Sequence, residues 1–459
     1  MTDESMDMKS KQAFLLVAFF VLFSWLIFQQ LQDLSLSSFV FSDSLYLATM
    51  DRFGWANYSS PINVNYFPDY LFYQASSVLS VDPFVRVIYT GLVQFALIAF
   101  AVTLVTKPYA AALYLSIYVF TALDFAVSLS SHTLLILQVI MTLYLPARFR
   151  FLAVMAFSLS DPMFLLIGSA YLVARSLVQK NSQYKQHVFL MAVWVLCFVY
   201  GELNNYFNKV ILMLIAGTLA SWFVQLAYAK FKIPITLTFS AEKVCGFLLL
   251  ATALALALME YPAWPIAPIR ERYIIAILGS GMVLLFQESV ITFSKLMLSL
   301  VCTAIFSVFL YLSAPAMVSK IDTEFARFDC LAKELITRGI DTVAVDYWVS
   351  KPLFLRSPEY LKLMQFEFFK AEPFLWGSPY AWAQGDVKYF IQRLGCTKES
   401  ERTHCTKDWL NTVAKPQALL CQSFELYAAD QPQSFHDITQ KSDSIQKNFK
   451  RKVTDKLGL

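Results

Sequence analysis

The sequence predicts a polytopic α-helical membrane protein with a small α/β domain at its C-terminus. Of the 459 residues, 57% are hydrophobic and 15% are charged, whereas a soluble domain averages about 25% charged residues. Apolar segments recur up to residue 318, after which the composition becomes mixed and charged. Lipid is therefore the expected solvent for the first part. This excludes a soluble enzyme and a disordered chain, and the net charge of +4 is too small to indicate a nucleic-acid partner.

About eleven apolar segments are long enough for a transmembrane helix, which needs about 20 residues. They begin near Gln12, Phe84, Tyr109, His132, Phe151, Met163, Val188, Val210, Val244, Tyr273 and Leu296. The segments near Phe151 and Val188 are short, so the true number could differ by about one or two. The first segment has no cleavage site after it and is expected to stay as an anchor.

The loops between these segments predict the orientation, because Lys and Arg favour cytoplasmic loops. With the N-terminus inside, the basic residues of the inner loops are Lys9, Lys11, Lys107, Arg148, Arg150, Arg175, Lys180, Lys185, Lys230, Lys232 and Lys295. The outer loops are mainly acidic, and their main basic exceptions are Arg52, Arg270 and Arg272. An odd number of spans then puts the C-terminus outside. We expect an inner-membrane protein of a bacterium with a periplasmic C-terminal domain.

The expected domains are a transmembrane domain over residues 1–318, with a long first outer loop at 29–83, and an α/β domain over residues 319–459. Periodicity in the second domain predicts an amphipathic helix ended by Gly339, two strands and a polar tail. The ranges are Ile321–Arg338 for the helix, Asp341–Val349 and Tyr360–Phe366 for the strands, and Gln431–Leu459 for a tail or loose helix.

The cysteines agree with this division. Three lie inside apolar segments, while Cys330, Cys396, Cys405 and Cys421 all fall in the C-terminal domain. An even number in an outside domain predicts two disulfides in an oxidising compartment. Three pairings are open, and Cys396–Cys405 with Cys330–Cys421 is favoured. A zinc site has weak support, because there is no C-x-x-C and only His404 is near.

The first outer loop contains the strongest candidate for a catalytic base. Asp43 lies among serines and aromatic residues just after the first span. A carboxylate at the membrane surface can accept a proton from a hydroxyl nucleophile. Asp43 could instead cap a helix that begins at Ser44. Further along the loop, Asp69 begins an aromatic, amphipathic stretch to Leu79, which predicts a helix lying in the membrane interface.

The loop before the tenth span contains candidate phosphate ligands. Three prolines precede Arg270-Glu-Arg-Tyr273, where the next span begins. The forked guanidinium groups of Arg270 and Arg272 suit phosphate oxygens, and lipid phosphates lie at this depth. The alternative is that both arginines extend toward lipid headgroups and pair with Glu271.

Three more polar residues are, together with Asp69, candidates for an acceptor or donor site. Asp124 lies inside the third span, where an ionisable residue is a functional candidate by default. His132 lies at the outer end of the next span, where a polar cap is the alternative. Asp161 precedes Pro162, and this pair would also form a plain tight turn.

Several motifs are absent from the sequence. There is no G-x-x-x-x-G-K-[ST] loop, no G-x-S-x-G elbow and no H-E-x-x-H helix, so nucleotide hydrolysis and zinc proteolysis have no support. No cofactor is expected, and nothing supports a divalent metal.

The layout resembles the GT-C superfamily of integral-membrane glycosyltransferases. The shared features are an inside N-terminus, an acidic residue in a long first outer loop, many spans and an outer C-terminal domain. Arg270-Glu-Arg-Tyr273 looks like the Arg-Tyr element at a late span of these enzymes, and Gly339-Ile-Asp-Thr-Val-Ala-Val-Asp-Tyr-Trp348 looks similar to the start of the soluble tail in bacterial members. One difference is that Ser44, not a second acid, follows Asp43.

The resemblance implies inverting transfer of a sugar from a polyprenyl-phosphate donor to a glycan, lipid or protein acceptor. Asp43 would be the general base, and Arg270, Arg272 and Tyr273 would hold the leaving lipid phosphate. Two other classes remain open. A lipid-linked-sugar flippase, transporter or polymerase-like protein is the main alternative, although no internal repeat is visible. A membrane scaffold with a sensory outer domain would leave Asp43 and both arginines without a role.

Overall fold

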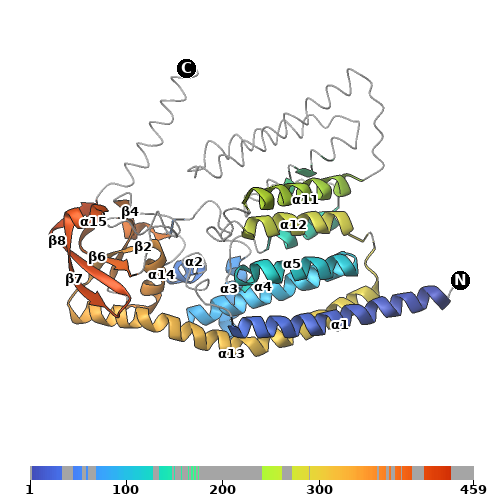
Figure 1. Ribbon diagram of the computed structural model, residues 1–459, viewed down its shortest axis with the longest axis horizontal. Coiled ribbons are helices and arrows are strands. Elements are labelled where there is room, and N and C mark those ends of the chain that lie inside the picture. Colours follow the sequence, from blue (N-terminus) through green and yellow to red (C-terminus); the bar gives the residue numbers. More distant parts are fainter. Residues whose placement is uncertain are drawn as a thin grey trace, which may run out of the picture. The chain divides into compact units, whose positions relative to one another are not determined.

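The computed structural model describes most of the chain outside its middle and its last residues (Figure 1). The described ranges are 3–33, 45–53, 58–59, 69–127, 134–146, 240–260, 271–288, 290–358, 361–368, 372–373, 378–383, 385–394 and 408–435, with isolated residues between 149 and 174. The chain forms two units. Unit 1 contains Met1–Leu34, Ile62–Val81 and Val85–Met317, and unit 2 contains Ser35–Pro61, Asp82–Phe84 and Val318–Leu459.

Unit 1 is helical. Its described elements are α1 (Asp3–Asp33), α3 (Asp69–Ala75), the 3-10 helix η3 (Ser76–Val78), most of α4 (Pro83–Val105), α5 (Pro108–Val127), α6 (Leu135–Tyr144), α11 (Ala241–Glu260), α12 (Glu271–Phe286) and the first part of α13 (Phe293–Thr337). Within the described chain, three helices are long and apolar enough to cross a membrane, namely Lys11–Gln32 of α1, α4 and α13. Shorter apolar helices cover Pro108–Val119, Leu135–Tyr144 and Ile274–Phe286. The count of eleven spans stays a prediction.

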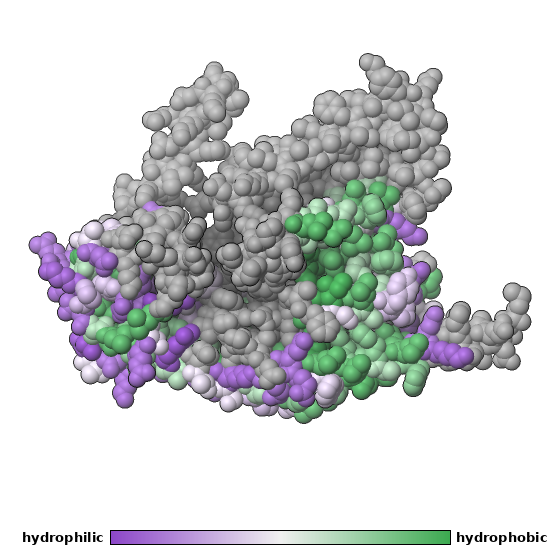
Figure 2. Space-filling model, in the orientation of Figure 1, coloured by the Kyte–Doolittle hydropathy of each residue, from purple (hydrophilic) through white to green (hydrophobic). Residues whose placement is uncertain are grey.

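The exposed surface of unit 1 is rich in large apolar side chains. Phe14 on α1, Phe247 on α11 and Tyr311 on α13 are 73%, 66% and 68% exposed. Apolar residues also cover much of the visible face over α11 and α12 (Figure 2). Water would penalise this surface, whereas lipid would not. Unit 1 is therefore suited to a hydrocarbon surrounding.

Glycines bring α11 and α12 into backbone contact. A Cβ atom placed on Gly246 of α11 would lie 2.8 Å from the Gly281 carbonyl oxygen and 2.8 Å from the Leu285 nitrogen, both in α12. Such an approach is typical of small residues at helix interfaces in membranes. The two helices lie side by side in Figure 1.

One end of unit 1 is tied together by loop contacts. The Lys107 N–H donates to the Phe286 carbonyl over 3.1 Å, and the Glu288 N–H donates to the Val105 carbonyl over 2.8 Å. Lys295 pairs with Glu288 at 2.6 Å and donates to the Thr106 carbonyl over 2.7 Å. Lys107 and Lys295, both expected in inner loops, therefore lie at the same end.

Unit 2 contains a six-stranded mixed sheet with the order β4-β3-β2-β6-β8-β7. The strands are β2 (Thr342–Asp346), β3 (Lys362–Glu367), β4 (Glu372–Pro373), β6 (Gly385–Arg393), β7 (Ala414–Leu420) and β8 (Phe424–Phe435), with α14 (Tyr347–Arg356), α15 (Asp408–Val413) and the 3-10 helix η6 (Tyr380–Ala383). Strand β2 is parallel to both β3 and β6, and the other pairs are antiparallel. The core includes Phe366, Phe390, Leu410 and Tyr427.

Four expected boundaries in this part were wrong. The helix expected at Ile321–Arg338 is the end of α13, which begins at Phe293 and contains Pro315. The strand expected at Asp341–Val349 ends at Asp346, whose carboxylate caps α14 by accepting from the Trp348 and Val349 N–H groups. The strand expected at Tyr360–Phe366 is β3, shifted to Lys362–Glu367. The first residues of the expected tail at Gln431–Leu459 belong to β8.

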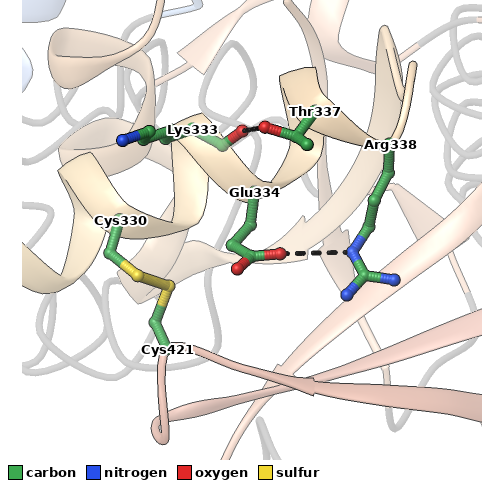
Figure 3. Close-up of a disulfide and its surroundings, with 6 residues drawn as sticks. All are labelled: Cys330, Lys333, Glu334, Thr337, Arg338 and Cys421. Atoms are coloured by element: carbon green, nitrogen blue, oxygen red, sulfur yellow. Dashed lines mark hydrogen bonds and ion pairs between the residues drawn. A yellow bond between two sulfur atoms is a disulfide. The ribbon is translucent and has the colours of Figure 1, made fainter.

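A disulfide joins Cys330 of α13 to Cys421 in the turn between β7 and β8 (Figure 3). Cys421 and Gln422 have φ angles of 49° and 55°, so this turn uses the left-handed region. One turn further along α13, Glu334 pairs with Arg338 at 3.3 Å. This disulfide is one of the two pairs favoured from the sequence. Cys396 and Cys405 lie outside the described residues.

Part of the segment expected as the first outer loop folds as a component of unit 2. Helix α2 (Tyr46–Phe53) packs against α14 and the short strand β5 (Ser378–Pro379). Strand β1 (Tyr58–Ser59) pairs antiparallel with β5, with Tyr58 opposite Pro379. The expected division at residue 318 left this segment in the transmembrane domain, whereas its contacts join it to the sheet-containing unit.

Candidate functional site

The candidate site is a buried polar cluster between α3–η3 and α4 in unit 1. Five side chains form this Asp69 cluster: Asp69, Ser76, Arg86, Thr90 and Gln94, all of which are buried. By contrast, Leu71, Val78 and Leu79 of the same segment are 55%, 88% and 57% exposed. The helix expected at Asp69–Leu79 is present, but its polar face is packed against α4 and its apolar face is outside.

Asp69 and Gln94 are hydrogen-bonded at the inner end of this cluster. The Gln94 side-chain amide donates through Nε2 to Asp69 Oδ1 over 2.6 Å. Asp69 is 3% exposed and Gln94 is 0% exposed. A carboxylate in such a place is costly unless it is hydrogen-bonded, and a bond to a charged acceptor is stronger than one between neutral groups.

Arg86 holds the other end of α3 and the start of η3. Its Nη2 donates to the Tyr73 carbonyl over 3.0 Å and to Gln74 Oε1 over 3.4 Å. The guanidinium also lies 4.0 Å from the centre of the Tyr73 ring, in a cation–π contact. Beside it, the Thr90 hydroxyl lies 3.1 Å from the Ser76 hydroxyl. These contacts fix α3 along the first half of α4.

The depth of the cluster follows from α4. Gln94 stands at the centre of this 23-residue helix, and half of its length is about 16 Å at 1.5 Å per residue. Because α4 is long and apolar enough to cross a membrane, Asp69 lies level with the middle of a candidate span. Ionisable residues at such depth mark substrate or ion pathways by default.

Three other candidate residues belong to helix ends that lie together on one side of unit 1. The contacts Tyr109–Phe286, with ring centroids 5.8 Å apart, and Tyr114 with Gly279 make α5 antiparallel to α12. The C-terminal turn of α5, with Asp124, is therefore at the end where α12 begins with Arg272 and Tyr273. Since α4 is joined to α5 by a short connection at Thr106–Lys107, its Arg86 end is also on this side.

The structure does not describe the side chains of the remaining candidate residues. Asp43, His132, Asp161 and Arg270 lie outside the described residues, as do the side chains of Asp124, Arg272 and Tyr273. The convergence of Asp43 with the arginines stays a prediction.

Arg86, Thr90 and Gln94 were not among the site residues predicted from the sequence. These residues are spaced four apart in an otherwise apolar segment, so they share one helix face. A polar stripe of this kind on a membrane helix is the signal that could have found them, because it needs a polar partner such as the Asp69 segment.

Within the described part of the chain, no group of three or more His, Cys, Asp or Glu side chains could hold a metal ion. Comparison of the chain with family models, curated proteins and solved structures finds no match. The function is therefore inferred from the residues themselves.

Proposed function

We propose that this protein is an integral-membrane glycosyltransferase of the GT-C type, which moves a sugar from a polyprenyl-phosphate donor to an acceptor on the outer face of the membrane. Asp43 is the general base that deprotonates the acceptor hydroxyl. Arg270, Arg272 and Tyr273 hold the lipid phosphate as the glycosidic bond breaks. Asp69 and Asp124 belong to the polar surroundings of the sugar.

The observation that supports this proposal most is that three helix ends with charged residues lie on one side of the described part of unit 1. The ends of α4, α5 and α12 that contain Arg86, Asp124 and Arg272 lie on one side. At the opposite end, the Lys295–Glu288 pair and the loop hydrogen bonds join the helices. A donor with an apolar tail and a charged phosphate suits a site at one end of apolar helices. The disulfide in unit 2 adds support, because disulfides persist on the oxidising side of a membrane.

The test uses host membranes that contain the full chain. Transfer is measured by mass spectrometry as consumption of the polyprenyl-phosphate sugar. Asp43→Asn removes the proton acceptor and should lower turnover by a factor on the order of 10²–10⁴, with donor binding nearly unchanged. Arg270→Ala and Arg272→Ala should weaken donor binding as well as turnover, because the phosphate contact exists before and during the reaction.

Asp430→Asn is the control, because Asp430 is an exposed carboxylate on β8 that pairs with Lys415 at the surface of unit 2. It should leave turnover unchanged. Full transfer by Asp43→Asn would refute the catalytic assignment.

One observation favours the alternative of a lipid-linked-sugar flippase or transporter. The Asp69–Gln94 pair lies level with the middle of α4, and transporters often bind their substrates near the bilayer midplane. Reconstitution into vesicles with a labelled lipid-linked sugar separates the two functions. A flippase moves the labelled lipid between leaflets without an acceptor, whereas a transferase consumes it only when an acceptor is present.

A further inference from the structure

Arg52 is a basic residue in a loop that is expected outside, whereas Lys and Arg favour cytoplasmic loops. Its contacts in unit 2 indicate a specific structural role. Its Nη1 donates to the Phe354 carbonyl over 2.7 Å, and its Nη2 donates to the Ser357 carbonyl over 3.1 Å. Ser357 is the C-cap residue of α14. Carbonyl groups at a helix C-terminus lack partners within the helix and carry partial negative charge. One guanidinium fork satisfies two of them.

Aromatic packing reinforces this attachment. The Arg52 guanidinium lies 4.6 Å from the centre of the Phe354 ring. The ring of the next residue, Phe53, lies 5.1 Å from that of Phe354 and 6.1 Å from that of Trp382, measured between centroids. Such ring pairs stabilise a contact beyond the effect of the buried area. The C-terminal end of α2 is therefore attached to α14 by charge and by ring contacts.

The element that receives Arg52 is itself fixed to the sheet. At its N-terminus, α14 is capped by Asp346, whose carboxylate also pairs with Arg393 of β6 at 3.0 Å. In its middle, the Ser350 hydroxyl donates to Gln365 of β3 over 2.8 Å. The N-terminus and the middle of α14 are thus held by the sheet, so that a group bonded to its last carbonyls has a defined position.

We propose that α2 is a positioning element for the catalytic loop, with Arg52 as its anchor on the C-terminal unit. Tyr46, where α2 begins, follows Asp43 with only Ser44 and Leu45 between them. Because only three peptide bonds separate Asp43 from Tyr46, fixing Tyr46 restricts the positions that are open to Asp43. This inference rests on the proposed function only for the role of Asp43.

The experiment measures amide hydrogen exchange and sugar transfer on the full-length protein in membranes or nanodiscs. Arg52→Gln removes the charge and the fork and should raise exchange in residues 45–53 by about 10-fold or more, as expected from the loss of charged hydrogen bonds. Exchange in β6 should stay unchanged. Turnover should fall about 10-fold or more while the donor KM stays the same, because a misplaced base affects the chemical step.

Two further variants make the result decisive. Arg338→Gln removes an arginine whose ion pair with Glu334 is on an exposed face, so it should change neither exchange in residues 45–53 nor turnover. Arg52→Lys keeps the charge but loses the planar fork, so intermediate effects are expected. If Arg52→Gln also raises amide hydrogen exchange in β6, the sheet itself is disturbed. Exchange in residues 45–53 and turnover are then compared between Arg52→Lys and the wild type.

The outcomes separate this inference from the proposed function. Unchanged exchange in residues 45–53 would overturn the anchor. Raised exchange with unchanged turnover would overturn the positioning role and leave the anchor. Loss of turnover in Asp43→Asn together with normal turnover in Arg52→Gln would keep the proposed function and reject this inference.

Discussion

At the scale of single residues, the most informative group is the Asp69–Gln94 pair. Its contact joins two segments of unit 1 that are separate in sequence, and both side chains are almost fully buried. In the described part of the chain, Gln94 Oε1 is a buried acceptor without a hydrogen-bond partner. A buried acceptor of this kind can accept a hydrogen bond from water or from a hydroxyl group of a bound ligand.

The pair can be tested by a double-mutant cycle. Gln94→Leu leaves Asp69 without its amide donor and should lower the free energy of unfolding by about 1–3 kcal/mol. The double variant Asp69→Leu/Gln94→Leu should lose less than the sum of the two single changes, because replacing both polar partners avoids a buried unsatisfied group. Thermal unfolding in detergent micelles measures all three.

Thr252→Ala is the control for this cycle, because its exposed hydroxyl bonds only to a carbonyl of its own helix. It should stay within about 0.5 kcal/mol of the wild type. Strictly additive losses in the double variant would show that Asp69 and Gln94 do not interact.

At the scale of elements, close packing of α11 on α12 depends on glycine. A methyl group at Gly246 would meet backbone atoms of Gly281 and Leu285, which cannot rotate away. Gly246→Ala should therefore destabilise the protein by about 1–3 kcal/mol. The matched control is Ala255→Leu, a larger change on the exposed face of the same helix. A higher melting temperature in Gly246→Ala would contradict the packing.

The disulfide supplies a second prediction for elements. Reduction or Cys330→Ser should lower the stability of unit 2 by about 2–4 kcal/mol, since Cys330 and Cys421 are separated by 91 residues. Cys302→Ser, at a buried free cysteine in α13, should respond to reductant as the wild type does. Peptide mapping without reductant should recover the Cys330–Cys421 pair, and two free thiols at these positions would contradict it.

Element boundaries were the least predictable part of the C-terminal region. The change in composition at Ser319 predicts an end of the last span, but α13 continues through it. A change from apolar to charged residues alters what surrounds a helix, not its backbone hydrogen bonds. Similarly, Tyr347–Val349 have strand-forming side chains, yet Asp346 caps a helix there.

At the scale of the whole molecule, the charge distribution predicts which loops share a side of the membrane. Lys107 and Lys295 lie at one end of unit 1, as the inner-loop assignment requires. In a chain whose native cysteines are protected beforehand, Lys107→Cys should be labelled by an impermeant maleimide only from the cytoplasm. Lys415→Cys, an exposed position on β7, should be labelled only from outside. Labelling of both from one side would refute the orientation and the proposed mechanism.

The amount of the site that was predictable from sequence differs between residues. Asp69 was found because it begins an aromatic, amphipathic stretch of the first loop, and Cys330–Cys421 because cysteines in one domain have few partners. Gln94 and Arg86 were not found, because the polar stripe that they form with Thr90 does not by itself show which segment packs against it. Their partner, the Asp69–Val78 segment, is identified by folding alone.

The sequence by itself determined that much of this chain belongs in lipid, because 57% hydrophobic and 15% charged residues leave no other solvent for so much apolar surface. It also determined a separate region with strands at its end. Only the tertiary structure decided which segments meet: α2 with α14, and Asp69 with the middle of α4. Composition acts through each residue's own transfer free energy, whereas such pairings depend on distances between residues far apart in the chain.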